Sequence, residues 1–127
     1  GEKVKTEIDK QYLLVERTWK AGDEVSFSMA MPVEVVAADP RVKANIGKRC
    51  LQRGPLVYCM EEIDNPLYNN ATLLHSTNYI ANFEPDLLGG VVSITAVNGD
   101  DTYKFIPYYA WDNREAGKMQ VWVKYEE

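Results

Sequence analysis

The sequence has little of what metal, membrane or nucleic-acid chemistry requires. Among its 127 residues there is one histidine, His75, and there are two cysteines, Cys50 and Cys59, which are too few for a zinc site. No stretch approaches the roughly 20 apolar residues of a membrane span, and no apolar leader segment opens the chain. Lysine and arginine total 14 against 19 acidic residues, a net charge of −5. Without clustered basic residues, we expect no nucleic-acid or membrane partner.

The remaining composition is that of a soluble globular domain. Hydrophobic residues make up 46% and charged residues 26% of the chain, which is ordinary for such proteins. A chain of this length buries enough surface for a core without metals or disulfides. We therefore expect a single domain, 1–127, with Cys50 and Cys59 as free, buried thiols, although a disulfide between them stays open at this point.

Period-two hydrophobicity dominates the chain and predicts strands. Val25, Phe27 and Met29 alternate with polar residues, and the turn residues 21–23 separate this run from another at 13–19. Residues 1–31 therefore predict a β-hairpin. Further strands are predicted at 33–37, 50–62 (with a bulge or strand switch at 54–55), 90–97, 103–109 and 118–125, and one helical turn at 39–45. This pattern favours an all-β fold, an antiparallel β-sandwich of jelly-roll type.

No self-sufficient active site is visible. His75 has no nucleophile motif beside it. The pairs Glu61-Glu62 and Asp100-Asp101 are adjacent in sequence, so on a strand their side chains face opposite ways and form no acid/base dyad. Catalysis by this chain is therefore the least favoured hypothesis.

Aromatic residues are the second group with functional potential. Trp19, Trp111 and Trp122, with two neighbouring tyrosines at 108 and 109, could stack on sugar rings. Trp122 alternates with valines, which favours the core or an interface. Trp111 lies in a predicted loop beside Asn113 and Arg114 and is the best candidate for an external contact.

Three segments together resemble a known family. They read RTWKAGD at 17–23, RGPLVYCMEEIDN at 53–65 and PYYAWDNR at 107–114, followed by MQVW at 119–122. In this order they resemble the C-terminal region of glycoside hydrolase family 127, typified by bacterial β-L-arabinofuranosidases. The resemblance implies a parent enzyme with an (α/α)₆ catalytic barrel followed by β-sandwich domains.

The resemblance also implies where catalysis takes place. The family's cysteine nucleophile, zinc ligands and acid/base glutamate lie in the barrel, and their motifs do not occur in this sequence. Cys59 belongs to the sandwich motif, so no catalytic role is assigned to it. We expect no cofactor in this chain, the zinc belonging to the missing catalytic domain.

The family pattern suggests an internal boundary near 38–42. Residues 1–38 then resemble a hairpin from the end of the preceding middle sandwich, and residues 42–127 the C-terminal sandwich. The apolar face of that hairpin must pack within this unit or on another molecule.

The resulting hypothesis is a non-catalytic accessory domain that supports the upstream barrel and contributes to a homodimer contact. The candidate interface or carbohydrate residues are Trp111, Asn113, Arg114, Tyr109 and Trp19. The alternative is a carbohydrate-binding module that uses surface aromatics, and it requires these aromatic side chains to be exposed.

Overall fold

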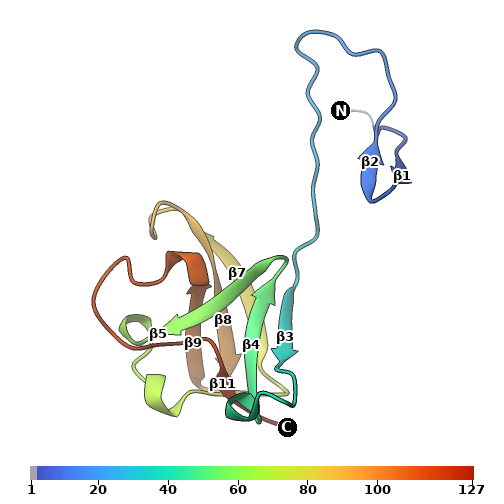
Figure 1. Cartoon of the computed structure of the whole chain (residues 1–127). Helices are drawn as coiled ribbons and strands as arrows, with labels where there is room; N and C mark the ends of the chain where they lie inside the picture. Colours follow the sequence, from blue (N-terminus) through green and yellow to red (C-terminus); the bar gives the residue numbers. More distant parts are fainter. Residues whose placement is uncertain (1–2) are drawn as a thin grey trace.

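The computed structural model describes residues 3–127, which form two parts (Figure 1). Residues 33–127 form the sandwich, and residues 3–32 form an arm that extends away from it. No helix within residues 3–127 has the length and apolarity to cross a membrane. The first two residues of the predicted hairpin lie outside the described residues.

The sandwich is built from nine strands of one curled sheet. Along it the strands follow the order β6, β11, β4, β5, β9, β8, β7, with β3 paired to β4 and β10 paired to β5. The strands are β3 (Val33–Ala37), β4 (Lys48–Arg53), β5 (Leu56–Glu61), β6 (Thr72–Leu74), β7 (Asn78–Glu84), β8 (Val91–Asn98), β9 (Asp101–Pro107), β10 (Met119–Gln120) and β11 (Val123–Glu126). All pairs are antiparallel except β6 with β11. The predicted all-β fold is confirmed, and its jelly-roll topology stays a prediction.

The core lies inside the curl of this sheet. β6 contacts β8, and β3 contacts β7, so the two ends of the sheet approach each other. The interior holds alternate residues of the central strands, among them Leu51, Tyr58, Ile94 and Phe105, none of which is exposed. The buried Tyr58 hydroxyl donates to the carbonyl oxygen of Val92 at 2.9 Å, so the core contains this polar group at no cost in unmet hydrogen bonds.

Two tight turns set the register of the central strands. Gly99 has a φ of +61°, and β8 and β9 pair from Asn98 opposite Asp101, as the Asn-Gly-Asp sequence predicts. Gly54 has a φ of +57° and β4 and β5 pair from Arg53 opposite Leu56. The predicted bulge or strand switch at 54–55 is therefore a two-residue hairpin turn.

Other predicted elements differ in detail from the structure. Residues 118–125 form two strands, β10 and β11, separated by a bend. The predicted helical turn at 39–45 is a turn followed by the 3₁₀ helix η1 (Lys43–Asn45), with Asp39 Oδ1 accepting from the backbone N–H of Arg41 at 2.9 Å. The segment 65–82, which the sequence pattern left unassigned, contains the 3₁₀ helix η3 (Tyr68–Asn70), β6 and the start of β7.

The arm departs most from the sequence prediction. Its regular structure within residues 3–32 is a small hairpin of β1 (Glu7–Asp9) and β2 (Tyr12–Leu14), and residues 25–31 are extended without a partner strand. The turn at Gly22 exists, with the N–H of Asp23 donating to the carbonyl oxygen of Lys20 at 3.1 Å. The predicted hairpin over 1–31 is wrong because the two alternating runs on either side of this turn do not pair with each other. Phe27 is 67% exposed.

We expect removal of residues 1–30 to change the free energy of unfolding of the sandwich by less than about 1 kcal/mol. Met31, which packs over Gly54, stays in the shortened chain, and the arm upstream of it is exposed. Urea denaturation followed by far-ultraviolet circular dichroism would measure the difference. A much larger loss would show that the arm packs on the sandwich in solution.

Candidate functional site

The two family-like motifs meet at a buried ion cluster. The motif at 53–65 spans β5 and the 3₁₀ helix η2 (Glu62–Asp64), and the motif at 107–114 spans η4 (Tyr108–Ala110) and the start of the loop 111–117. Arg114 donates to both oxygens of Asp64, at 2.9 and 2.6 Å, and to Glu61 Oε2 at 2.5 Å. We call these three residues the Arg114 cluster. It joins segments 50 or more residues apart in the chain.

Burial makes this cluster a strong structural element. The side chain of Glu61 is 6% exposed and that of Arg114 is 19% exposed. A buried carboxylate without a partner is costly, and a guanidinium that binds it through several hydrogen bonds offsets that cost. Asp64, and secondarily Glu61, raise the pKa of Arg114, although burial opposes them. The guanidinium is therefore charged at every accessible pH.

Asn65 fixes the carboxylate side of the cluster. Its side chain is buried, and Nδ2 donates to the carbonyl oxygens of Glu61 at 2.7 Å and Lys104 at 3.0 Å. Its Oδ1 accepts from the backbone N–H of Lys104 at 2.8 Å. Asn65 thus attaches η2 to β9 and keeps Glu61 and Asp64 in place for Arg114.

Backbone contacts hold the loop that carries Arg114. The N–H of Asp112, a residue with a φ of +62°, donates to Glu61 Oε1 at 3.2 Å. Asn113 Nδ2 donates to the carbonyl oxygens of Ala110 at 3.1 Å and Trp111 at 2.9 Å. Glu61 therefore uses one oxygen for the loop backbone and the other for Arg114.

Four of the five candidate residues lie close together in the chain, with Tyr109 in η4 and Trp111, Asn113 and Arg114 on the loop that follows it. Tyr109 is 64% and Trp111 37% exposed, and Trp111 stacks on Tyr108 with ring centroids 6.0 Å apart. Asn113 and Arg114 direct their side chains inward, to the loop and to the cluster. Trp19 lies apart from them on the arm, 51% exposed, with the Arg17 guanidinium 5.2 Å from its ring centroid. An interface or carbohydrate role for these five stays a prediction.

Sequence reasoning missed Glu61 and Asp64 as the partners of Arg114. The sequence pattern presents Glu61 only as half of the Glu61-Glu62 pair and Asp64 only as part of the motif at 53–65. The available signal was the joint presence of an acidic motif and a motif ending in arginine, which is uninformative until the fold brings the two segments together.

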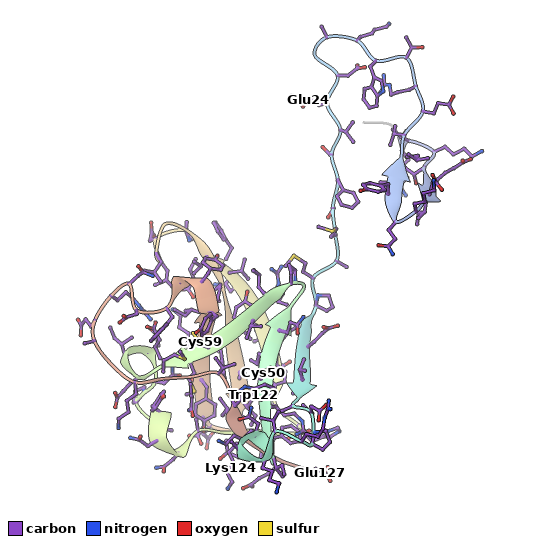
Figure 2. The ribbon with its side chains drawn as sticks, viewed as in Figure 1. Glu24, Cys50, Cys59, Trp122, Lys124 and Glu127 are labelled. Atoms are coloured by element: carbon purple, nitrogen blue, oxygen red, sulfur yellow. The ribbon has the colours of Figure 1, made fainter. Side chains whose placement is uncertain are left out.

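Burial makes both cysteines unreactive. Cys50 and Cys59 are free thiols inside the sandwich, as predicted (Figure 2). Burial, reinforced by the nearby Glu61 carboxylate and opposed by Arg114, raises the pKa of Cys59 to about 12; burial also raises the pKa of Cys50. A thiol of this kind has almost no thiolate at neutral pH, and the thiolate is the nucleophile.

The lone histidine stands apart from the Arg114 cluster. His75 Nδ1 lies 3.2 Å from the hydroxyl oxygen of Tyr125 in an exposed contact. Within the residues that the structure describes, no three His, Cys, Asp or Glu side chains are placed to hold a metal ion. In the Arg114 cluster, Nη1 and Nη2 of Arg114 are committed to the two carboxylates, which makes the cluster a structural clamp, and its buried Nε has no hydrogen-bond partner among residues 3–127.

We expect Arg114→Ala to lower the free energy of unfolding by about 3 kcal/mol, because it leaves Glu61 buried and unpaired. Urea denaturation would measure the loss. Arg41→Ala is the control, since Arg41 also pairs with an aspartate, Asp39, but at the surface, where little change is expected. Equal losses in the two variants would contradict a structural role for the cluster.

We expect Cys59 to make the native state less stable as the pH rises above 9. The unfolded thiol ionises near 9.0 and the native thiol near about 12, so between these values the native state binds more protons and its stability falls with pH. Relative to Cys59→Ala, the wild-type chain should lose roughly 1 kcal/mol per pH unit in this window. Urea denaturation from pH 8 to 11 measures this, and Cys50→Ala should show a smaller effect of the same sign, because burial also raises the pKa of Cys50. Parallel pH profiles for wild type and Cys59→Ala would contradict it.

Comparison with known proteins identifies the family. The model of the glycoside hydrolase family 127 C-terminal domain matches residues 33–124. A non-reducing end β-L-arabinofuranosidase of Bifidobacterium longum subsp. longum is 36% identical to this chain. The match covers 89% of this chain and 21% of that protein.

Solved structures agree with this assignment. A family 127 β-L-arabinofuranosidase from Geobacillus stearothermophilus T6 superimposes with a TM-score of 0.69 at 44% identity, over 76% of this chain and 18% of that one. A second family 127 β-arabinofuranosidase gives a TM-score of 0.79 at 34% identity, over 97% of this chain and 22% of that one. The chain thus spans about a fifth of the length of these relatives, and it belongs to glycoside hydrolase family 127, of which residues 33–124 form the C-terminal domain.

Proposed function

We propose that this chain is a non-catalytic accessory domain of a larger β-L-arabinofuranosidase-like hydrolase, and that it docks on the remainder of that enzyme through its arm. The observation that carries this proposal is the unpartnered apolar face of residues 25–29. Val25, Phe27 and Met29 are 57%, 67% and 66% exposed, in a stretch that alternates like a strand.

An extended segment of this kind leaves both its backbone and its side chains without partners. Its backbone lacks ladder hydrogen bonds within residues 3–127, and its side chains expose one continuous apolar face. Adding such a segment to a sheet edge supplies both missing contacts at once. About four-fifths of the length of each relative lies outside the part that this chain matches, and that remainder is the natural source of the covering surface.

The sandwich supports the proposal through its rigidity. The Arg114 cluster and Asn65 fix the loops next to the core, and Cys59 is a buried, protonated thiol. These features suit a domain that transmits mechanical support and carries no nucleophile. Zinc and the catalytic residues are expected in the upstream barrel.

We expect Phe27→Asp to lower the melting temperature of the full-length parent enzyme by several degrees and to leave the 127-residue chain unchanged. A charge on the docked face is costly only where that face is buried. Differential scanning calorimetry on both proteins measures this. The control is Ile46→Asp, which introduces the same charge on the sandwich at a residue that is equally exposed, at 67%.

Two outcomes would contradict the docking proposal. An unchanged melting temperature in the parent would mean that residue 27 is not covered there. A 127-residue chain that is dimeric by size exclusion with light scattering, and monomeric after Phe27→Asp, would identify a second copy as the covering surface.

A further inference from the structure

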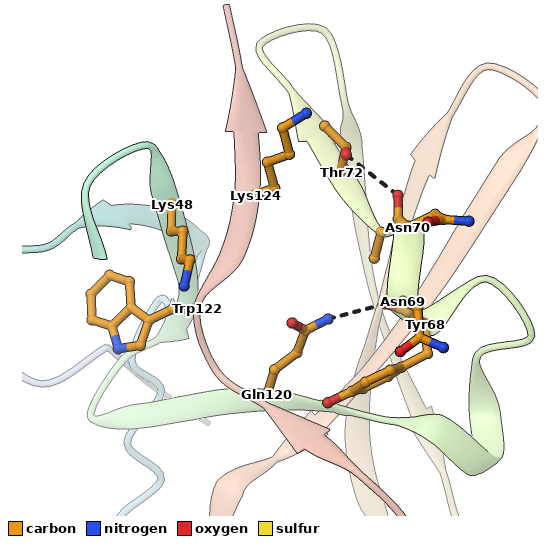
Figure 3. Close-up of a pocket in the computed structure, with 9 residues that line it drawn as sticks. Lys48, Tyr68, Asn69, Asn70, Thr72, Gln120, Trp122 and Lys124 are labelled. Atoms are coloured by element: carbon orange, nitrogen blue, oxygen red, sulfur yellow. Dashed lines mark hydrogen bonds between the residues drawn. The ribbon is translucent and has the colours of Figure 1, made fainter. Parts of the chain in front are cut away.

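A polar cavity lies at the opposite side of the fold from the arm. It occupies about 310 Å³ where β10 and β11 are separated by the bend at residues 121–122 (Figure 3). This volume falls at the lower end of small-ligand sites. We call it the Trp122 pocket, after the indole that forms one of its walls. It shares no residue with the Arg114 cluster.

The strand register places two lysines side by side in this pocket. Lys48 on β4 pairs directly with Lys124 on β11, and Lys124 pairs with Thr72 on β6, so the three side chains form one row on one face. Like charges opposite each other on neighbouring strands are destabilising. An anion between the two ammonium groups would relieve this repulsion.

The positive charge of this row is only partly compensated. Lys124 Nζ lies 2.5 Å from Glu126 Oε1, but both side chains are more than half exposed, and such surface pairs are weak. Lys48 is half-buried and has no carboxylate within ion-pair distance among residues 3–127. None of the residues that line the pocket is acidic, although the chain as a whole carries a net charge of −5.

Amide groups occupy the wall opposite the indole (Figure 3). Asn69 and Asn70, in η3, have side-chain amides without a hydrogen-bond partner in the described part of the chain. Gln120 is positioned by a hydrogen bond from Nε2 to the carbonyl oxygen of Tyr68 at 3.3 Å, which leaves its Oε1 as an acceptor. Together these groups offer hydrogen-bond donors and acceptors to the hydroxyls of a ligand.

The indole supplies the third element of recognition. Trp122 is half-buried, and Figure 3 shows it beside Lys48 at the rim of the pocket, across Gln120 from the asparagines. A half-exposed indole presents a flat apolar surface that stacks on an apolar ligand face. An inorganic anion would bind to the lysines alone and would make no contact with the indole.

We propose that the Trp122 pocket binds an anionic saccharide, with a uronate ring stacked on Trp122 and its carboxylate between Lys48 and Lys124. The hydroxyls of the ring bind to the Asn69, Asn70 and Gln120 amides. This inference is independent of docking through the arm, because the pocket and the arm share no residue. It assigns the chain a carbohydrate contact of its own.

The test is a nuclear magnetic resonance titration of the 127-residue chain. Methyl glucuronide and methyl glucoside form the central pair of probes because they differ only in the carboxylate. Inorganic phosphate and an acidic hexapeptide report on anion binding without a sugar. The Trp122 indole resonance, identified by its loss in Trp122→Leu, and the asparagine side-chain amides are the readouts.

We expect saturable shifts of these resonances with the glucuronide and about tenfold weaker binding of the glucoside. Lys48→Gln should weaken glucuronide binding about fivefold, and rising salt should weaken it further. Trp19→Leu and Lys20→Gln on the arm are matched controls that should bind as the wild type does. The Lys48 variant keeps the test valid even if Trp122→Leu fails to fold.

Four results would overturn the proposal. They are equal binding of glucuronide and glucoside, phosphate binding as tight as glucuronide binding, tighter binding of the peptide, and no shift of the Trp122 indole at tens of millimolar ligand. The first removes the role of the lysines, the second leaves a simple anion site, the third makes the occupant an acidic protein segment, and the fourth leaves no saccharide site. None of them bears on the docking of the arm.

Discussion

The buried carboxylate of Glu61 is the constraint on which the C-terminal half of this domain depends. The side chain of Glu61 is 6% exposed, so its charge must be neutralised by another group of the protein. Arg114 neutralises it from a segment 53 residues later in the chain. The same guanidinium donates hydrogen bonds to Asp64, and the backbone N–H of Asp112 donates to the other oxygen of Glu61. The loop 111–117 contains no strand or helix of its own, so this cluster determines its path.

This dependence gives the family-like motifs a structural meaning. The acidic end of RGPLVYCMEEIDN and the arginine of PYYAWDNR are the two halves of one ion cluster, joined to β9 by Asn65. Cys59, two residues before Glu61 in the chain, is buried near the cluster, and burial raises the pKa of its thiol to about 12. These family motifs therefore contain the ion pairs that join two distant segments of the domain.

Sequence could predict those features that local chemistry decides. Alternation in residues 91–107 and the Asn98-Gly99 turn specify a hairpin without help from the remaining chain. The alternation at 25–31 predicts a face but not its partner, and that partner is absent from residues 3–127. β7 was missed because most of its residues are exposed on both faces, which removes the periodic signal. The pairing of Arg114 with Glu61 is nonlocal, and no spacing rule reveals it.

The two unassigned surfaces differ in the kind of partner that their physics requires. The arm exposes large apolar side chains on an unpaired backbone, and covering it gains free energy in proportion to the area buried, which suits a permanent contact. The Trp122 pocket is polar, positively charged and stable in water when empty, because solvent satisfies its amides and lysines. Its occupant must compete with water and salt and so binds reversibly. One small domain thus combines a surface suited to assembly with a surface suited to exchange.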